Sequence, residues 1–507
     1  MNISSLRFLV ILSISFAVTP MLWAQANPGD DLQAILDLGD DLVLLQGAVY
    51  EVAKTLRYKK AGQRIYTQGA RFPSEYATLK IADDSLMMLI NGSHVEGVIL
   101  ENVICDGNRY ELGVVDKPNR IGGGGQPAMV HFGANGGDRT IIRNNVFMNT
   151  RTWSTVKMHE GASGMLTENN IIFSIGVDPR GNGRETNEIP FTWSDGVSCA
   201  ATDSVIRNNL IIDPTDVGIV LYGAPGTVVE NNAIATISRE SMGGINLVDP
   251  LELYAIDKEK NIIDYRGVKI RNNYIDAFGA RIHMSIPVGC AVWVPHWKGK
   301  ILLGGEVSYN TIAGDASAYG IVAHGISEWT IMGNISTGKY SGLAEYGDHR
   351  NPPDGPAPFL FDKPSVVDSE LQTDFVPVER HIDHLLRTQM APIDQFGYQM
   401  HDYGHYEIQA VVNAAYIEML GRDPTEREFT VAKELLESRQ RNADGLRRTI
   451  MNTKEFMEKN GDLNPNDLHP FRNQLWFEIC DKIIREQGGT FSAVALYKDG
   501  LAALYRN

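Results

Sequence analysis

The sequence predicts a mainly β protein, in which a long solenoid of short strands precedes a small all-α domain. Three observations lead to this prediction: paired asparagines recur through the first two-thirds of the chain, a proline-rich stretch then interrupts the pattern, and a helical pattern follows. The 507 residues exceed one ordinary domain, although repetitive β folds run long as one unit. Glycine is frequent, at 49 residues, and because no collagen period is present these glycines are expected in turns.

Residues 1–26 have the features of a secretory signal peptide. Arg7 is the only charged residue there, an apolar run covers residues 8–17, and an A-x-A cleavage site ends at Ala26. The run is too short to span a bilayer, and no later stretch is long enough either, so no membrane span is expected. We therefore expect a secreted protein, periplasmic or extracellular. The alternative is that the segment remains as a membrane anchor.

The repeat is carried by asparagine pairs that follow short β-branched strands, as in residues 141–145 (I-I-R-N-N). The last asparagine of each copy lies at positions 102, 145, 170, 209, 232, 273, 310 and 334. The intervals are 43, 25, 39, 23, 41, 37 and 24 residues, so the shorter ones define a unit near 24 and the longer ones contain loops. Stacked units of this kind form parallel sheets around a core of Ile, Val and Leu. Asparagine suits the turns and can hydrogen-bond from coil to coil as a ladder, so we expect these residues to be structural.

The start of the solenoid is expected to be closed by a short amphipathic helix at residues 31–39, followed by strands at 41–47 and 49–52. With this cap and the Asn-Asn coils, the chain resembles the right-handed parallel β-helix proteins of the pectate-lyase-like superfamily, and we assign residues 27–346 to such a β-helix. The superfamily includes polysaccharide lyases, glycoside hydrolases, epimerases, phage tailspikes and adhesins, so the resemblance implies the fold rather than one activity. It also implies Ca²⁺ as a candidate cofactor, although no acidic cluster in the sequence specifies a site.

The tail differs in character from the repeat. Residues 347–400 are rich in proline and are predicted to be a linker or extended segment, and residues 401–507 are predicted to form an α-helical domain. One helix is expected to be capped by Asp423, with Pro424 in its first turn. The phrase at 420–424 (L-G-R-D-P) resembles a small helical domain of unknown function with an L-G-R-x-P signature, which occurs in secreted bacterial proteins. That resemblance implies a role of the helical tail in attachment; a plain helical bundle is the alternative.

Charge and cysteine content exclude several classes of function. The chain carries 46 Lys and Arg against 62 Asp and Glu, a formal charge of −16, which argues against a nucleic-acid partner and against an anionic membrane surface. The four cysteines lie at 105, 199, 290 and 480 without C-x-x-C spacing, so neither a zinc ribbon nor a redox motif is expected. Buried free thiols are expected, with one long-range disulfide left open.

The insertions between repeats are expected to form the walls of an outward face on which a sugar chain could lie. A polysaccharide is therefore the expected substrate or ligand. The predicted substrate-binding residues are charged, aromatic or imidazole side chains in or after these loops: Arg184, Glu188, Trp193, Trp293, Trp297 and His324.

Four residues on neighbouring coils are predicted to be catalytic. The alternation of apolar side chains points His131, Lys157 and His159 outward, with Asp195 near the start of the next strand. Because adjacent coils are about 4.8 Å apart, these groups would lie within one sugar ring of each other. Lysine or histidine can abstract the acidic C5 proton of a uronate, so a lyase or epimerase acting on uronate-containing polysaccharide is the expected function. Lys157 is the favoured base if neighbouring positive charge lowers its pKa.

Other interpretations stay open. The outward polar residues can be an ordinary solvated face, in which case the protein is a non-catalytic surface or carbohydrate-binding protein. A glycoside hydrolase needs a carboxylate pair, for which Asp195 and Asp216 are the candidates, with Asp213 beside them. Polygalacturonases carry a basic motif after a Gly-His-Gly motif. This order is not kept here, because the basic segment at Lys269 precedes A-H-G at 323–325. The match to alginate and chondroitin lyases is partial, since their Arg-His-Gly is missing.

Overall fold

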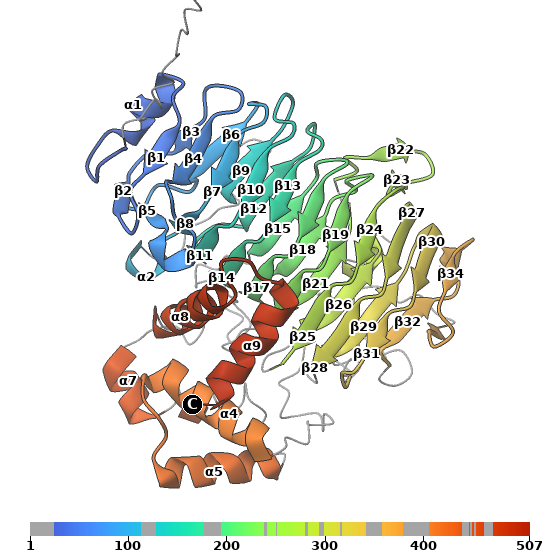
Figure 1. Ribbon diagram of the computed structural model, residues 1–507. Coiled ribbons are helices and arrows are strands. Elements are labelled where there is room, and N and C mark those ends of the chain that lie inside the picture. The colour runs from blue at the N-terminus through green and yellow to red at the C-terminus, as the bar shows by residue number, and fades with distance from the viewer. Residues whose placement is uncertain are drawn as a thin grey trace, which may run out of the picture.

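In the computed structural model, the chain forms a solenoid of stacked coils with a group of helices along one side (Figure 1). Each coil contributes one strand to each of three sheets, and the described strands pair in parallel, except for the hairpin of β22 (Ala255–Asp257) and β23 (Ile262–Asp264). The predicted mainly β solenoid is therefore confirmed as a three-sheet parallel β-helix. The structure describes residues 25–112, 128–176, 194–237, 241–249, 251–278, 282–293, 299–314, 317–340, 357–378, 405–438, 446, 449–450, 453–460 and 470–506.

The three sheets run along the whole β-helix. Besides the hairpin, sheet A contains β1 (Leu42–Leu44), β4 (Arg64–Thr67), β7 (Ile99–Glu101), β10 (Ile141–Arg143), β13 (Leu166–Glu168), β16 (Val205–Arg207), β19 (Val228–Glu230), β24 (Lys269–Arg271), β27 (Ile301–Ser308), β30 (Ile326–Met332), β33 (Val366–Val367) and β34 (Glu370–Leu371). Sheet B contains β2 (Val49–Val52), β5 (Ala77–Ile81), β8 (Val103–Asp106), β11 (Val146–Thr150), β14 (Ile171–Ile175), β17 (Leu210–Pro214), β20 (Ala233–Ala235), β25 (Tyr274–Ala277), β28 (Thr311–Gly314) and β31 (Ile335–Ser336). Sheet C contains β3 (Leu56–Arg57), β6 (Ile90–Ser93), β9 (Ala128–Gly133), β12 (Ser154–His159), β15 (Asp195–Cys199), β18 (Val217–Leu221), β21 (Ser241–Leu247), β26 (Ile282–Val288), β29 (Ser317–Ala323), β32 (Phe359–Asp362) and β35 (Val376–Val378).

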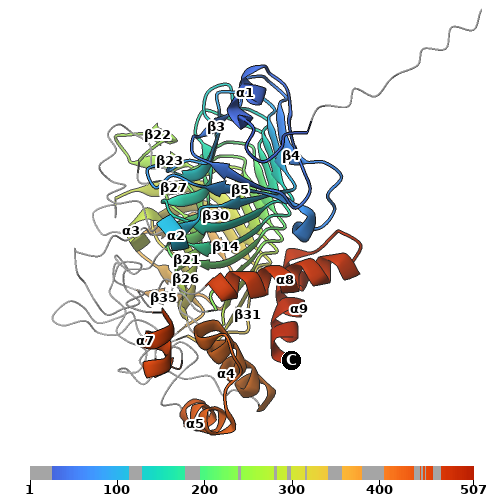
Figure 2. The same ribbon diagram turned by 90° about the vertical axis from the view of Figure 1, so that its left-hand side faces the viewer.

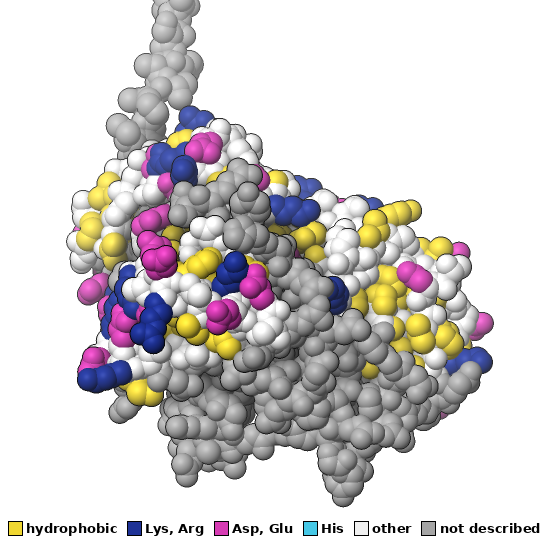
Figure 3. Space-filling model, turned by 90° about the horizontal axis from the view of Figure 1, so that it is seen from below, with side chains coloured by type: hydrophobic (Ala, Val, Ile, Leu, Met, Phe, Trp, Pro, Cys, Tyr) yellow, Lys and Arg dark blue, Asp and Glu magenta, His cyan; other side chains and the backbone are white. Residues whose placement is uncertain are grey.

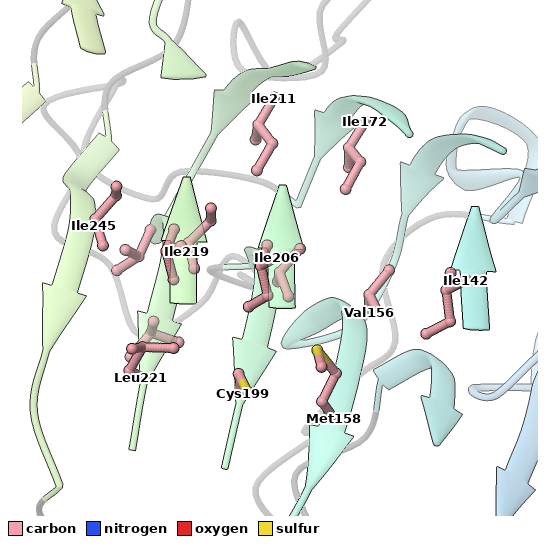
Figure 4. Packing of buried hydrophobic residues seen from close by; sticks show 14 of the residues in the cluster. Ile142, Val156, Met158, Ile172, Cys199, Ile206, Ile211, Ile219, Leu221 and Ile245 are labelled. Carbon is pink, nitrogen blue, oxygen red and sulfur yellow. The ribbon is translucent and has the colours of Figure 1, made fainter. Parts of the chain in front are cut away.

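The interior of the β-helix is filled by apolar side chains that project from all three sheets. In one coil, Ile142 of β10, Phe147 of β11 and Val156 of β12 are fully buried, and equivalent residues repeat on the following coils. Figure 4 shows this packing, with Ile142, Ile172 and Ile206 among the labelled side chains between the strands. Burying a side chain of this size stabilises a fold by about 1.5–3 kcal/mol. The stacked core is therefore the main source of stability of the solenoid.

The four cysteines belong to these packed regions. All four are free thiols and all are buried, which agrees with the expectation and leaves no disulfide. Burial raises the pKa of the Cys199 and Cys480 thiols to about 12, so both are protonated and unreactive at neutral pH.

The asparagine ladder predicted from the repeat is present. Asn145 donates from Nδ2 to Oδ1 of Asn170 at 3.1 Å, and Asn170 donates in the same way to Asn209 at 2.9 Å. The same bond then links Asn209, Asn232, Asn273, Asn310 and Asn334 in order. Gln372 ends the ladder by accepting from Asn334 at 3.3 Å. These buried amides are satisfied by each other and by backbone carbonyls, so their role is structural.

Asn102 does not belong to this ladder, contrary to the prediction. The register of β7 and β10 places it opposite Asn144 rather than Asn145. Asn102 and Asn144 both have φ of +54°, a left-handed conformation that asparagine tolerates better than most residues. Val103 takes the ladder position, where its N–H donates to Oδ1 of Asn145 at 3.2 Å. The first asparagine of each pair makes the turn, and the second makes the ladder.

Charged side chains alternate along the outward face of sheet A, immediately before the turn asparagines. The row across six coils is Glu101, Arg143, Glu168, Arg207, Glu230 and Arg271. Neighbouring coils form ion pairs along it, as in Arg207–Glu168 at 2.7 Å and Arg271–Glu230 at 2.9 Å. Pairs with exposed partners are worth about 0–1 kcal/mol each. Their strict alternation therefore favours the correct coil register more than it adds stability.

The first coil is closed by helix α1 (Leu32–Asp37), as expected. Asp31 caps it by accepting from the N–H groups of Gln33 and Ala34, both at 3.1 Å. Ala26, predicted to be the last residue of the signal peptide, forms a bridge with Leu44 and is buried in this coil. Three further short helices are η1 (Pro73–Glu75), α2 (Arg109–Leu112) and α3 (Cys290–Trp293).

The β-helix continues beyond the boundary expected at residue 346. Strand β32 pairs with β29, and β35 pairs with β32, so residues up to 378 extend sheet C within the predicted linker at 347–400. Pro358 and Pro377 occupy places that a parallel sheet allows. The carbonyl of Pro358 accepts from the N–H of Gly320 at 2.9 Å, and Pro377 lies in the terminal strand β35, whose outer edge pairs with no described strand.

The helical tail begins with α4 (His405–Leu420), α5 (Glu426–Glu437) and α7 (Lys454–Asn460), which share one hydrophobic core. The cap of α5 is Thr425 rather than the predicted Asp423. A reciprocal pair of bonds explains the shift, because the Thr425 hydroxyl accepts from the N–H of Glu428 and the Glu428 carboxylate accepts from the N–H of Thr425.

The L-G-R-D-P phrase joins these three helices. Gly421 ends α4 with φ of +65°, which glycine adopts without strain. Arg422 then binds Glu428 of α5 at 2.9 Å and Glu455 of α7 at 2.5 Å. Such multiply bonded guanidinium pairs fix geometry as well as adding energy. The motif thus has a structural role in this chain.

Helices α8 (Pro470–Glu486) and α9 (Ala493–Arg506) lie against the outward face of sheet B, as two views at right angles show (Figure 1, Figure 2). Trp476 of α8 and Leu496 of α9 belong to the same hydrophobic cluster as Leu210 of β17. The last two helices are therefore a cover of the β-helix.

Hydrogen bonds fasten this cover at its edges. Oδ1 of Asn208 accepts from the N–H of Ala493 at 2.6 Å, and the hydroxyl of Tyr497 donates to Asp276 at 3.0 Å. On the face seen in Figure 3, Lys and Arg side chains are interspersed with Asp and Glu rather than gathered by sign. Within the described ranges, no helix is long and apolar enough to cross a membrane.

Candidate active site

Three polar side chains form one row on the outward side of sheet C. The strand register places His131 of β9 opposite Lys157 of β12, and Lys157 opposite Ser198 of β15. Val156 and Met158, the neighbours of Lys157 along its strand, are fully buried in the core, so Lys157 faces outward. Because paired strands are about 4.8 Å apart, the row brings an imidazole, an amine and a hydroxyl together.

A second imidazole lies beside this row. The rings of His131 and His159 are stacked, with centroids 5.0 Å apart and planes at 28°. Nδ1 of His159 lies 2.8 Å from a carboxylate oxygen of Glu160. On the preceding coil, Nδ1 of His94 is 3.0 Å from the carbonyl of Asn135. The outward face of an acidic protein therefore carries a local group of basic side chains.

His131 is held in its neutral form. Burial lowers the pKa of His131 to about 3, and the positive charges of Lys157 and His159 contribute in the same direction. Its Nε2 is buried and has no hydrogen-bond partner among the residues that the structure describes. A neutral imidazole with an unused nitrogen can donate or accept one hydrogen bond from a bound molecule.

Lys157 is also affected by its surroundings. Burial lowers the pKa of the Lys157 amine, while the carboxylates of Glu160 and Asp195 act in the opposite direction. The sequence-based expectation was that neighbouring positive charge would lower this pKa; burial is the principal cause instead. A partly buried lysine of this kind has a larger neutral fraction, which is the form that accepts a proton.

Asp195 lies at the start of β15, with 3% of its surface exposed. Its Oδ2 accepts from Oγ of Ser198 at 2.6 Å, and Ser198 Oγ lies 2.5 Å from Ser154 Oγ. Burial raises the pKa of Asp195 well above its ordinary value, and the negative charge of Asp216 raises it further. The bond from Ser198 and the charge of Lys157 oppose this shift. Burial therefore favours the neutral carboxylic acid form of Asp195, beside a base.

The two other aspartates of the hydrolase alternative differ from each other. Asp216 directly precedes β18, is buried, and lies on the coil next to Asp195. Asp213 lies in β17 of sheet B, on another side of the β-helix, where its Oδ1 accepts from the N–H of Ile237 at 2.7 Å. Asp195 and Asp216 thus form a carboxyl pair on sheet C, and Asp213 has a turn-stabilising role.

The predicted substrate-binding residues are not brought together in the described part of the chain. His324 follows β29 and is fully buried, with Nε2 3.7 Å from a carboxylate oxygen of Asp362. A fully buried side chain does not fit the predicted contact with substrate. The sequence spacing did not reveal that β32 pairs with β29 and places Asp362 beside His324. Trp293 ends helix α3, and its side chain is not described. Four predicted residues lie outside the described residues: Arg184, Glu188, Trp193 and Trp297.

Sequence reasoning missed three groups that the structure adds to this face. Ser154 is the first residue of β12 and Glu160 directly follows the strand, so both flank the predicted Lys157 and His159. Their closeness in sequence to these two residues could have identified them as members of the site. Asn246 of β21 was not anticipated. It lies in the register row of Ser198, two coils further on, and both polar atoms of its buried amide lack hydrogen-bond partners among the described residues.

A resident metal ion does not fit the described residues. No group of three or more His, Cys, Asp or Glu side chains in the described ranges is arranged to hold one. Ca²⁺ takes about 6–8 oxygen ligands. Of the carboxyl groups at this face, Asp195 accepts from Ser198 through Oδ2 and Glu160 lies against His159.

Comparison with known proteins gives similarity of structure only. No protein-family model matches the sequence, and no curated protein matches it either. An alginate lyase from Paenibacillus sp. str. FPU-7 is similar at 15% identity and a TM-score of 0.38, over 61% of this chain and 94% of the lyase. An endo-xylogalacturonan hydrolase from Aspergillus tubingensis is similar at 11% identity and a TM-score of 0.42, over 69% and 94%. The A-module of a mannuronan C-5 epimerase from Azotobacter vinelandii is similar at 16% identity and a TM-score of 0.30, over 63% and 94%.

At these identities and TM-scores, the similarities assign no activity to this chain. The fold is evident from the coils themselves, which stack into three parallel sheets around one core. The chain is a three-sheet parallel β-helix whose sheet C presents a basic group beside a buried carboxyl pair.

Proposed function

We propose that this protein acts on a uronate-containing polysaccharide by removing the C5 proton of a sugar ring, as a lyase or an epimerase. One observation carries the proposal: His131, Lys157 and Ser198 lie in register on three adjacent coils, and burial lowers the pKa of the amine in the middle. A general base works best when its pKa lies near the operating pH. The row therefore holds a base, and beside it hydrogen-bonding groups for a carboxylate.

The chemistry follows from the acidity of the substrate. The C5 proton of a uronate lies next to its carboxylate, so negative charge develops on that carboxylate as the proton leaves. The neutral amine of Lys157 accepts the proton at Nζ. His131 and the neighbouring His159 can each donate a hydrogen bond from a ring N–H to the sugar carboxylate, so both stabilise the developing charge. Loss of the O4 leaving group then gives an unsaturated product, whereas return of a proton to the other face gives the epimer.

The local side chains agree with an anionic ligand. The whole chain has a formal charge of −16, yet His94, His131, Lys157 and His159 gather on one face. Imidazole and amine groups donate hydrogen bonds to a carboxylate. This group of side chains therefore supports a local site for acidic sugars on an otherwise acidic protein.

The test is an assay of the purified protein with alginate, polygalacturonate and glycosaminoglycans. Unsaturated uronates absorb near 235 nm, and epimers are distinguished by NMR of the polymer. We expect Lys157→Ala to reduce kcat by about 10²–10⁴-fold, because one general base contributes that much. Lys269→Ala, which removes an exposed lysine from sheet A, is the matched control and should leave activity unchanged. Full activity of Lys157→Ala would rule out this assignment.

A specific observation also favours a second function, hydrolysis of a glycosidic bond. Asp195 and Asp216 are buried carboxyls on adjacent coils, and the charge of Asp216 raises the pKa of Asp195. A pair of carboxyls supplies the acid and the base of many glycosidases. Hydrolysis would release reducing ends without absorbance near 235 nm. It would be abolished by Asp216→Asn and spared by Lys157→Ala, the opposite of the lyase pattern.

The location of this activity is part of the proposal. The signal-like segment at 1–26 supports export, and extracellular or periplasmic space is where long polysaccharides are met. Attachment through the whole helical tail has less support, because α8 and α9 use their apolar faces to cover sheet B. Glycan binding without any product, for all polymers tested, would favour the non-catalytic alternative.

A further inference from the structure

A short chain of hydrogen bonds links two strands of sheet C close to Lys157. Ser154 of β12 contacts Ser198 of β15 at 2.5 Å, and Ser198 donates to Asp195 at 2.6 Å. The two serines are 1% and 2% exposed, so water does not compete for their hydroxyls. Ser198 is also the register partner of Lys157, which places this chain one strand spacing from the proposed base.

We propose that Ser198, supported by Ser154, is a positioning residue that holds Asp195 as the proton donor to the leaving group. This inference rests on the lyase form of the proposed function. A lyase needs a proton donor for the leaving oxygen O4 in addition to the base Lys157, and we assign that role to the buried carboxyl of Asp195.

The two oxygens of Asp195 have different environments. Oδ2 is fixed by the hydroxyl of Ser198, whereas Oδ1 is buried and has no hydrogen-bond partner among the described residues. Buried carboxyl oxygens without a partner are rare in folded proteins and indicate a missing ligand or a functional role. One oxygen therefore anchors the group, and we assign the other, which the surrounding residues shield from solvent, to the sugar oxygen that it would protonate.

The proton and charge balance of the step is complete. Nζ of Lys157 takes the proton from C5, the electron pair of that bond forms the C4–C5 double bond, and the C4–O4 bond breaks. O4 leaves with the proton that Asp195 carries on Oδ1. Lys157 becomes a cation and Asp195 an anion, and the two charges stabilise each other because the residues interact electrostatically. Proton exchange with water then restores both groups.

The test compares Ser198→Ala with Ser198→Thr, which keeps the hydroxyl, and with Ser204→Ala, which removes another buried serine hydroxyl at the turn before β16. Because the bond from Ser198 stabilises the ionised form of Asp195, its removal should raise the pKa of Asp195 further. We expect kcat of Ser198→Ala to fall about 10–100-fold with little change in KM, and the alkaline limb of the pH–kcat profile to move to higher pH. Ser198→Thr should restore the limb, and Ser204→Ala should not move it.

A direct measurement separates this inference from the proposed function. The titration of Asp195 can be followed by carboxyl ¹³C NMR in the whole protein, with assignment by Asp195→Asn, whether or not any polymer is turned over. An unchanged Asp195 titration in Ser198→Ala would overturn the positioning role. A shifted titration without uronate chemistry in the wild type would instead overturn the lyase proposal. Ser154→Ala leaves the Ser198–Asp195 bond in place and should give a smaller change of the same sign; a shift as large as that of Ser198→Ala would also contradict the proposal.

Discussion

The outward faces of sheets B and C belong to the same coils but have opposite character. Sheet B presents Val146, Ile171 and Leu210, and helices α8 and α9 cover them. One strand further along each coil, sheet C presents His131, Lys157 and a buried carboxyl. Burial on sheet B places apolar groups against apolar groups, which stabilises the fold. Burial on sheet C affects titratable groups and shifts their pKa values.

The difference shows that burial stabilises the fold at sheet B and opposes folding at the titratable groups of sheet C. On sheet C, burial lowers the pKa values of His131 and Lys157 and raises that of Asp195, so each group is pushed away from its preferred charged form. Such shifts destabilise the folded state at the pH where the unfolded chain would be charged. A face whose groups are held against their own preference is typical of a functional site. The sheet B cluster contains Cys480 and Tyr76, but burial raises their pKa values and so keeps these groups in the neutral form that they ordinarily have at neutral pH.

The largest change in the free energy of unfolding is expected from a substitution in the helices that cover sheet B. Trp476 is 1% exposed in the cluster that joins α8 to the sheet, so Trp476→Ala should lower the free energy of unfolding by about 3–5 kcal/mol. Thermal unfolding followed by circular dichroism measures it. Val431→Ala, at a half-exposed position of α5, is the control and should change stability little. An equally small effect of Trp476→Ala would mean that the helices are a separable module.

A smaller effect, dependent on pH, is expected on sheet C. The unfolded pKa of histidine is about 6.5, and that of His131 is about 3 in the folded protein, so between these values the unfolded state binds the extra proton. Stability therefore falls as pH falls through this window and is unaffected above it. At pH 5 this loss amounts to about 2 kcal/mol, and His131→Gln should not show it. Urea unfolding at pH 8 and pH 5 tests this; identical pH dependence in both proteins would contradict it.

The smallest expected change in stability is a gain rather than a loss, and it concerns Asp195. Asp195 has a raised pKa, so its contribution to stability is present at low pH and is lost as pH rises from about 4 toward that pKa. Asp195→Asn should therefore be more stable than wild type by about 1 kcal/mol at pH 7, while losing the proposed activity, and should show no gain at pH 4. Asp499→Asn, at an exposed position of α9, is the control. A loss of stability at pH 7 in Asp195→Asn would show that Asp195 is ionised and structural.

Much of the fold could be predicted because its signals are local. The spacing of Asn145, Asn170 and Asn209 indicated the coils, and the same residues form the ladder. Alternation within β12 indicated that Lys157 and His159 face outward, since side-chain direction in a strand depends on position alone. Asn102 was misplaced because spacing cannot tell the first asparagine of a pair from the second.

The sequence contains a signal for the cover of sheet B. Strand β11 is apolar at three successive positions (146–148) and β14 at 171–173, a pattern typical of strands buried on both faces. It predicts that something packs on the outside, though not which segment. The prolines after residue 346 were more misleading, because proline is compatible with a terminal edge strand as well as with a linker.

The sequence by itself determined the period of the coils, the ladder and the outward direction of the candidate site. These follow from hydrogen-bonding capacity and strand alternation, which each residue carries with it. Only the tertiary structure decided that α8 and α9 cover sheet B, that His324 is buried against Asp362, and that burial raises the pKa of Asp195 while Ser198 donates a hydrogen bond to it. Burial and pKa depend on every atom around a group, including atoms from distant parts of the chain, and a period in the sequence does not contain that information.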